Sequence, residues 1–164
     1  ATYKVTVEGP FVPLILTDSL GHVVTDSSQS VTLKGSAELH FKVQPFLRVQ
    51  MVGDPVFNAD STVTVKAIVT RGTANPKYQQ HVTDINLYVS NTKYSGNNNY
   101  DPRYSKLVSY GGSNGDSLLG KTITITTGGG ALPRQDVFFR VGARISAGLN
   151  QYNYAAPVSI TYPK

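Results

Sequence analysis

Apolar and polar side chains alternate along much of this chain, and this period of two residues limits the folds that are open to it. The strongest example lies near the C-terminus, where every second residue is apolar: Val137, Phe139, Val141, Ala143 and Ile145. Such alternation places the apolar side chains on one face of a β-strand. Because the 3.6-residue spacing of amphipathic helices is almost absent, the chain is predicted to be all-β.

Turn-forming residues divide the region after Pro45 into about seven strand-like segments. They are residues 46–52, 63–69, 85–89, 106–110, 122–126, 137–145 and 158–162, of which 106–110 is the weakest and the last ends at Tyr162. Strands without intervening helices favour an antiparallel sandwich, and seven strands are typical of immunoglobulin and fibronectin type III domains. We expect the core to contain these alternating apolar residues: Val65, Val69, Ile85, Leu87, Ile123, Ile125, Phe139, Val141 and Ile160.

Residues 1–44 are predicted to be a separate structural unit. Alternation is present from Tyr3 to Val7 and from Leu39 to Val43, but these strands are too few for an independent sandwich. Pro45 interrupts the second run, and proline is tolerated at the first residue of a strand. We therefore interpret residues 1–44 as the C-terminal part of a preceding β domain and residues 45–164 as the sandwich.

The composition excludes several classes of chemistry. None of the 164 residues is cysteine, so disulfide frameworks, thiolate nucleophiles and cysteine-ligated zinc are ruled out. No window approaches the roughly 18 consecutive apolar residues that a membrane helix needs, so no transmembrane segment is expected in this fragment. The chain opens within a strand and without an initiator methionine, which we interpret as a mature fragment or a trimmed chain.

No motif for catalysis or cofactor binding is present. The histidines, His22, His40 and His81, lack the spacing of metal ligands, and neither a G-x-S-x-G elbow nor a phosphate loop occurs. We therefore expect no enzymatic activity, no metal and no cofactor. The open alternative is a polysaccharide-active enzyme whose acid pair is Asp101 and Asp116, although aspartates beside strands more often serve turns.

The formal net charge of +5 raises the question of nucleic-acid binding. The lysines and arginines are scattered singly, however, and the charge arises mainly from a shortage of glutamate. Arg140 and Arg144 share a face of one predicted strand, but two arginines form only a small patch. Nucleic acid is therefore not an expected partner.

One long polar segment, residues 91–117, interrupts the regular strands, and long loops in compact domains are usually functional or disordered. Its Tyr, Ser, Gly and Asn are the composition of binding loops, because tyrosine offers a flat apolar face and a hydroxyl. We predict a weak carbohydrate site here, in which tyrosines stack on sugar rings (Tyr94, Tyr100, Tyr104) and polar side chains bind the hydroxyl groups (Asn98, Asn99, Asp101).

Another role for the tyrosines stays open. Those of residues 91–117 fit equally well as caps on an edge of the sandwich, and for Tyr152 and Tyr154 we favour a structural role. Gly96, beside the run of asparagines, suggests a mobile tip that would lose conformational entropy on binding.

Several short strings give the chain a family resemblance. In the first part they are Ala1-Thr-Tyr-Lys-Val5, Val31-Thr-Leu-Lys-Gly35 and Leu39-His-Phe-Lys-Val-Gln-Pro-Phe-Leu-Arg-Val49, which resemble the tail of a carboxypeptidase-regulatory-like domain and its exit. Phe138-Phe-Arg-Val-Gly-Ala-Arg144 and Tyr152-Asn-Tyr-Ala-Ala156 resemble the closing strands of a second domain. Together they resemble an uncharacterised family of two-domain Bacteroidetes lipoproteins that occurs beside SusC/SusD-type glycan-uptake loci.

The resemblance implies a fibronectin-III/immunoglobulin-like antiparallel sandwich preceded by the remnant of a transthyretin-like β domain. It implies a non-catalytic accessory protein, lipid-anchored at the outer membrane, that binds a polysaccharide or oligosaccharide and contacts other glycan-uptake proteins. It supplies no binding residues, and this chain lacks the lipidation cysteine and the first strands of the first domain. Two other functions stay open: a structural spacer without a ligand and a polysaccharide-active enzyme.

Overall fold

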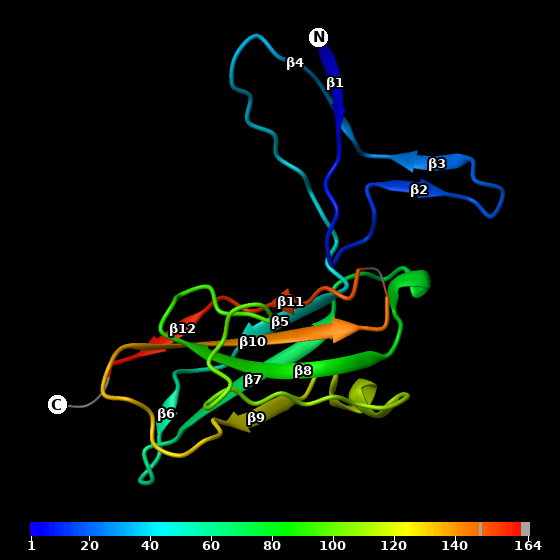
Figure 1. The fold of residues 1–164 in the computed structure, drawn as a ribbon. Helices are drawn as coiled ribbons and strands as arrows, with labels where there is room; N and C mark the ends of the chain where they lie inside the picture. The colour runs from blue at the N-terminus through cyan, green and yellow to red at the C-terminus, as the bar shows by residue number, and fades with distance from the viewer. Residues whose placement is uncertain (148, 162–164) are drawn as a thin grey trace.

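The computed structural model describes residues 1–147 and 149–161 and consists of antiparallel β-strands joined by loops (Figure 1). The helical elements among these residues are two short 3-10 turns, η1 (Pro76–Tyr78) and η2 (Asn114–Leu118). The all-β fold class predicted from the sequence is therefore confirmed. Tyr162, which the sequence placed in the last strand, lies outside the described residues.

The first sheet of the sandwich is organised around one long central strand, β7 (Val63–Arg71). β9 (Thr122–Thr126) pairs with one edge of β7, and the other edge carries β5 (Leu47–Met51) followed by β6 (Val56–Phe57). All of these pairs are antiparallel. The alternation of β7 buries every second side chain: Val63, Val65, Ala67 and Val69.

The second sheet is centred on β10 (Val137–Ile145). β8 (Val82–Ser90) pairs with β10 along almost its whole length, while the opposite edge of β10 pairs with β11 (Asn153–Tyr154) and β12 (Val158–Ile160). With the first sheet, this gives the two-layer, aligned strand order of an immunoglobulin-like or fibronectin type III sandwich (Figure 1).

The weak strand expected at residues 106–110 runs beside the free edge of β8 as isolated bridges rather than as a continuous ladder. Side chains replace part of its backbone pairing, because Asn86 Oδ1 accepts a hydrogen bond from the Val108 amide and Ser105 Oγ accepts one from the Val89 amide. The segment still covers the β8 edge, where unpaired backbone groups would otherwise be exposed.

The core lies between the two sheets, as the alternation predicted. Seven of the expected core residues are buried: Val65, Val69, Ile85, Leu87, Ile125, Phe139 and Val141. Ile123 and Ile160 are only partly buried, and both pack against the core from its margin. Both lie on edge strands, β9 and β12, which are covered from fewer sides than β7 or β10.

Residues 1–44 form two short antiparallel ribbons that stand off one end of the sandwich (Figure 1). One ribbon pairs β1 (Thr2–Val5) with β4 (Gln29–Thr32), and the other pairs β2 (Ile15–Thr17) with β3 (Val23–Asp26). Leu14 is the one buried residue in this part of the chain. Its assignment to the end of a transthyretin-like domain stays a prediction.

The strand expected from Leu39 to Val43 is wrong, because residues 36–44 form no strand ladder. Alternation describes which faces the side chains would occupy, but a strand also needs a neighbour for its backbone hydrogen bonds. Backbone pairing appears only at the end of this run, where the Val12 amide donates to the Gln44 carbonyl over 2.9 Å and Pro45 forms a bridge with Phe11. The amide of Phe46 then donates to the Pro10 carbonyl over 3.0 Å, so backbone bonds link the two parts of the chain where β5 is about to begin.

Replacing Leu87 by alanine should lower the free energy of unfolding by about 2–5 kcal/mol, because its side chain is fully enclosed in the core and would leave a cavity. Chemical denaturation measures the change. Leu107→Ala is the matched control, since Leu107 is 48% exposed and its truncation should cost no more than about 0.5 kcal/mol. Equal losses in the two variants would contradict this placement of the core.

Candidate functional site

The outer face of the second sheet carries a polar and aromatic layer in place of a plain solvent-exposed surface. β8 is buried on both faces, since Asp84, Asn86 and Tyr88 alternate with its core-facing residues and are themselves buried. We call this set of residues from β8, β10 and the segment at β11 the polar layer: Asp84, Asn86, Tyr88, Arg140, Arg144, Tyr152 and Tyr154.

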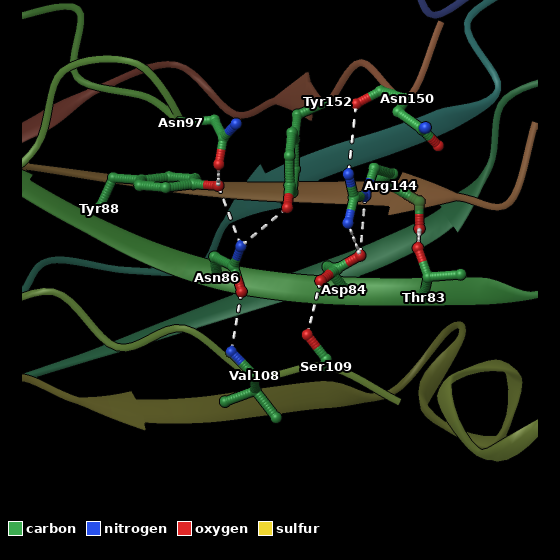
Figure 2. A network of polar contacts seen from close by, with 10 residues as sticks. All are labelled: Thr83, Asp84, Asn86, Tyr88, Asn97, Val108, Ser109, Arg144, Asn150 and Tyr152. Atoms are coloured by element: carbon green, nitrogen blue, oxygen red, sulfur yellow. Dashed lines mark hydrogen bonds and ion pairs between the residues drawn. The ribbon is translucent and has the colours of Figure 1, made fainter. Parts of the chain in front are cut away.

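A buried amide joins the tyrosines of this layer (Figure 2). Asn86 Nδ2 donates to the hydroxyl of Tyr88 over 2.9 Å and to that of Tyr152 over 3.2 Å. The Tyr88 and Tyr152 rings meet edge to face, with centroids 5.9 Å apart. Burial raises the pKa of the Tyr88 hydroxyl, so it stays protonated and available as a hydrogen-bond donor. The side chain of Asn86 thus fixes both rings on the face of the sheet.

The layer depends on a glycine in the middle of β10. Gly142 lies opposite Asn86 on β8 and Tyr154 on β11, and a Cβ there would come 2.7 Å from the Tyr154 ring and 3.0 Å from the Tyr88 ring. No other residue type leaves room for both rings to lie on the strand. The glycine in the string from Phe138 to Arg144 therefore has a packing role.

Two arginines on β10 each lie over one tyrosine ring. The Arg144 guanidinium carbon is 4.9 Å from the Tyr152 centroid, and its Nε donates to Asp84 Oδ2 over 2.8 Å. Burial disfavours the charged carboxylate of Asp84, but hydrogen bonds led by that from Arg144 outweigh burial and hold the pKa of Asp84 below its ordinary value of 3.8. The charge of Arg144 is therefore balanced inside the layer.

Arg140 lies in the equivalent position over Tyr154, at 4.4 Å from the ring centroid, but its partners are neutral. Its Nε donates to the Ala155 carbonyl over 2.9 Å and its Nη1 to the Ser95 carbonyl over 3.3 Å. Burial lowers the pKa of the Arg140 guanidinium, although not enough for it to lose its charge near neutral pH. Among the described residues, no carboxylate forms an ion pair with it.

The first half of the 91–117 segment is fastened to this layer. The Asn97 amide donates to the Tyr154 hydroxyl over 3.0 Å, and the backbones of Gly96 and Asn99 bond to each other. A Cβ on Gly96 would lie 2.9 Å from the Tyr154 hydroxyl. The close approach of the loop to Tyr154 explains Gly96, which composition alone had suggested as part of a mobile tip.

The structure separates the predicted stacking residues. Tyr100 contacts Tyr88, with ring centroids 5.4 Å apart, and Tyr104 packs against the core. Only Tyr94 among the three is largely exposed, at 65%. Tyr100 and Tyr104 thus make internal contacts, and the three tyrosines do not form one exposed platform.

The predicted hydroxyl-binding residues are also divided between places. Asp101 lines a cavity of about 220 Å³ together with Tyr100 and Tyr104, but both carboxylate oxygens accept hydrogen bonds from Arg103. The hydrogen bond from Arg103 lowers the pKa of Asp101. Asn99 is exposed at the tip, whereas Asn98 lines a different and larger hollow.

That larger hollow, of about 450 Å³, lies where the 91–104 loop meets the segment before β11. We call it the amide hollow, because its polar lining consists of four amide side chains and two tyrosines: Asn97, Asn98, Asn150, Gln151, Tyr152 and Tyr154. Sequence reasoning found Asn98 but missed Asn97, Asn150 and Gln151. The run Asn150-Gln-Tyr-Asn-Tyr154 was the available signal, because amides interleaved with tyrosines also make up the predicted loop.

The arrangement can bind hydroxyl groups, since each amide offers both a donor and an acceptor. It does not bring together the acid pair of the enzyme alternative. The Asp101 amide bonds to the Val89 carbonyl, while Asp116 accepts from the Val82 amide. These two points on β8 are roughly 20 Å apart, far more than the about 5–9.5 Å between the carboxyl groups of glycosidases.

Neither a metal nor a membrane helix is indicated in the part of the chain that the structure describes. No cluster of three or more potential metal-ligating side chains occurs among those residues. None of their helical segments has the length and apolar character needed to span a membrane.

The fold and this surface define an immunoglobulin-like β-sandwich with a polar, tyrosine-rich layer on one sheet. The chain belongs to the family described as "Domain of unknown function (DUF3823_C)", which matches residues 51–159. No curated protein matches the sequence.

Solved structures from Bacteroides and Parabacteroides species resemble almost the whole chain. A DUF3823 family protein from Bacteroides uniformis superposes with a TM-score of 0.86 at 30% identity, covering 99% of this chain and 74% of that one. A DUF3823 family protein from Parabacteroides merdae gives a TM-score of 0.64 at 16% identity, covering 98% and 70%. A second Bacteroides uniformis structure, described as a "putative carbohydrate binding protein", gives 0.61 at 21% identity, covering 98% and 73%.

Replacing Gly142 by alanine should destabilise the protein by about 1–3 kcal/mol, because the added methyl group would push the Tyr154 and Tyr88 rings from the strand. Thermal or chemical denaturation measures the change. Gly111→Ala is the matched control, since a Cβ at Gly111 meets nothing within 4 Å. A Gly142→Ala protein as stable as the control would show that the rings do not depend on the glycine.

Acid should weaken the stabilisation that the Asp84–Arg144 pair provides. Because the folded pKa of Asp84 lies below 3.8, its contribution is fully present above the unfolded value and is lost as the pH falls through the folded pKa. The stability difference between the native protein and Asp84→Asn should therefore narrow between pH 7 and pH 3. Urea denaturation at a series of pH values measures it, and a constant difference would contradict the pairing.

Proposed function

We propose that this chain is a non-catalytic carbohydrate-binding protein whose site is the amide hollow. The observation that carries the proposal is that four amide side chains and the rings of two tyrosines line one open hollow of about 450 Å³. Sugars present many hydroxyl groups that both donate and accept, and amides match them without adding charge. The volume is in the range of small-molecule sites.

The rigidity of the floor supports this proposal. Tyr152 is buried and hydrogen-bonded through Asn86, and the hydroxyl of Tyr154 holds the backbone of Asn97. The hollow is therefore partly pre-formed, so less conformational entropy is lost when a ligand binds. Its openness to solvent and the few direct contacts it can offer fit weak binding, from about millimolar to high micromolar dissociation constants.

The structural neighbour described as a putative carbohydrate binding protein supports the same class of ligand. At 21% identity that likeness concerns the fold, and the residues of the hollow carry the argument for this chain.

The setting we propose is the bacterial cell surface, where the chain would act as a lipid-anchored accessory protein of a glycan-uptake system. The resemblance of its strings to two-domain Bacteroidetes lipoproteins supports this setting. Dense presentation on a surface would raise the avidity of a weak site without any new contact.

A structural spacer without a ligand is the second candidate function. The observation that favours it is the use of Tyr100 and Tyr104 in internal contacts, which removes two of the exposed rings expected from the sequence. A spacer would contact neighbouring proteins of the uptake complex and bind no glycan.

A glycan array, followed by calorimetry on any polysaccharide that binds, tests the proposal. The double variant Asn98→Ala/Gln151→Ala should lose about thirtyfold in affinity, because each of the two lost hydrogen bonds typically contributes about 1 kcal/mol. Asn114→Ala, which truncates an exposed amide in η2, is the matched control and should bind as the native protein does.

Two results would count against the amide hollow. Undiminished affinity in the double variant would place the site elsewhere on the molecule. A native protein that binds no glycan on the array would favour the spacer.

A further inference from the structure

Among the residues that the structure describes, the polar layer leaves one positive charge without a counter-charge beside the amide hollow. Arg140 and Arg144 lie four residues apart on the same face of β10, and each covers one tyrosine of the hollow. Across the strand pair, Arg144 faces Asp84, whereas Arg140 faces Tyr88. The register therefore places a carboxylate opposite Arg144 and an aromatic ring opposite Arg140.

A second cation lies close to the same place. The Lys93 ammonium is 5.5 Å from the Tyr94 ring centroid, and the Arg140 guanidinium carbon is 5.8 Å from it, so both approach this exposed ring. Among the described residues, Lys93 forms no ion pair. An anion near both cations would offset the repulsion between them.

The hydrogen bonding of Arg140 leaves donors free for such an anion. Nε and Nη1 each bond one backbone carbonyl, and Nη2 bonds none of the described residues. The buried hydroxyl of Ser95, the residue whose carbonyl accepts from Nη1, also lacks a hydrogen-bond partner there. Guanidinium groups bind carboxylate and sulfate oxygens with particular strength, because planar donors match the geometry of these anions.

We infer that the ligand of this surface is an acidic glycan, with its anionic group at Arg140 and Lys93 beside Tyr94 and its sugar hydroxyls in the amide hollow. The inference rests on the proposed carbohydrate function and specifies the substrate class. The polar lining of the hollow contains no carboxylate that would repel such a ligand. Carboxylates of uronic acids and sulfate esters share this chemistry, so the experiment must separate them.

Calorimetry with two matched pairs of oligosaccharides tests the inference on the native protein. The first pair is an oligogalacturonate and its fully methyl-esterified form, and the second is a sulfated galactan oligosaccharide and its desulfated form. The charged member of one pair should bind about tenfold more tightly than its neutral partner or better. The pair that shows the difference identifies the anion as carboxylate or sulfate.

Protein variants locate the charge effect. Lys93→Met removes an exposed cation and should weaken binding of the charged oligosaccharide on the order of threefold to tenfold, leaving the neutral one unaffected. Lys66→Met is the matched control, because Lys66 is exposed on β7 in the other sheet and should have no effect. Arg140→Lys retains the charge without the planar donors and should fall between the native protein and Lys93→Met.

The outcomes separate this inference from the function on which it rests. Equal affinity for charged and neutral oligosaccharides would overturn the acidic specificity and leave the carbohydrate site intact. An equal loss in Lys93→Met and Lys66→Met would also overturn it, because it would indicate attraction to the whole basic protein. Failure to bind any oligosaccharide would overturn the inference and the proposed function together.

Discussion

The antiparallel pairing of β8 with β10 is the constraint on which both the core and the polar layer depend. Its register places Ile85 and Leu87 toward the first sheet and places Asn86 opposite Gly142 on the outer face. A slip of β10 by one residue would turn each of its side chains to the opposite face, and Arg140 and Arg144 would then point into the core. The cost of burying unpaired charges there makes the observed register strongly preferred.

Gly142 links that register to the surface. Because it has no side chain, the Tyr154 and Tyr88 rings lie directly on the strand, and the 91–104 loop in turn rests on the Tyr154 hydroxyl. The tyrosines therefore work first as a support for the loop, with their rings in contact with one another and with arginines. The amide hollow forms where this supported loop meets the residues before β11.

The electrostatic character of the surface follows from the same pairing. Asp84 balances Arg144 through a short, largely enclosed hydrogen bond, so this pair holds the sheet together and contributes little net charge. In the described part of the chain, the partners of Arg140 are carbonyl groups and aromatic rings, and its charge is left to act on whatever occupies the adjoining surface. The contrast between two arginines four residues apart is invisible in their spacing, since the two are equivalent with respect to β10 alone.

Alternation was sufficient to predict the long strands of the sandwich and most of its core, because β7, β8 and β10 each bury one apolar face against the opposite sheet. It did not predict the two-residue strands β6 and β11. It failed at Leu39 to Val43, where the period is present but no neighbouring strand supplies hydrogen bonds. Composition likewise singled out the Tyr- and Asn-rich loop, yet it could not reveal that Tyr100 and Tyr104 face inward while Tyr94 faces solvent. The sequence by itself determined the all-β class, the buried faces of the long strands and the location of an unusual polar segment. Only the tertiary structure decided which tyrosines are available, which arginine pairs with Asp84 and which amides share a hollow, because these depend on strand register and on contacts between residues far apart in the chain.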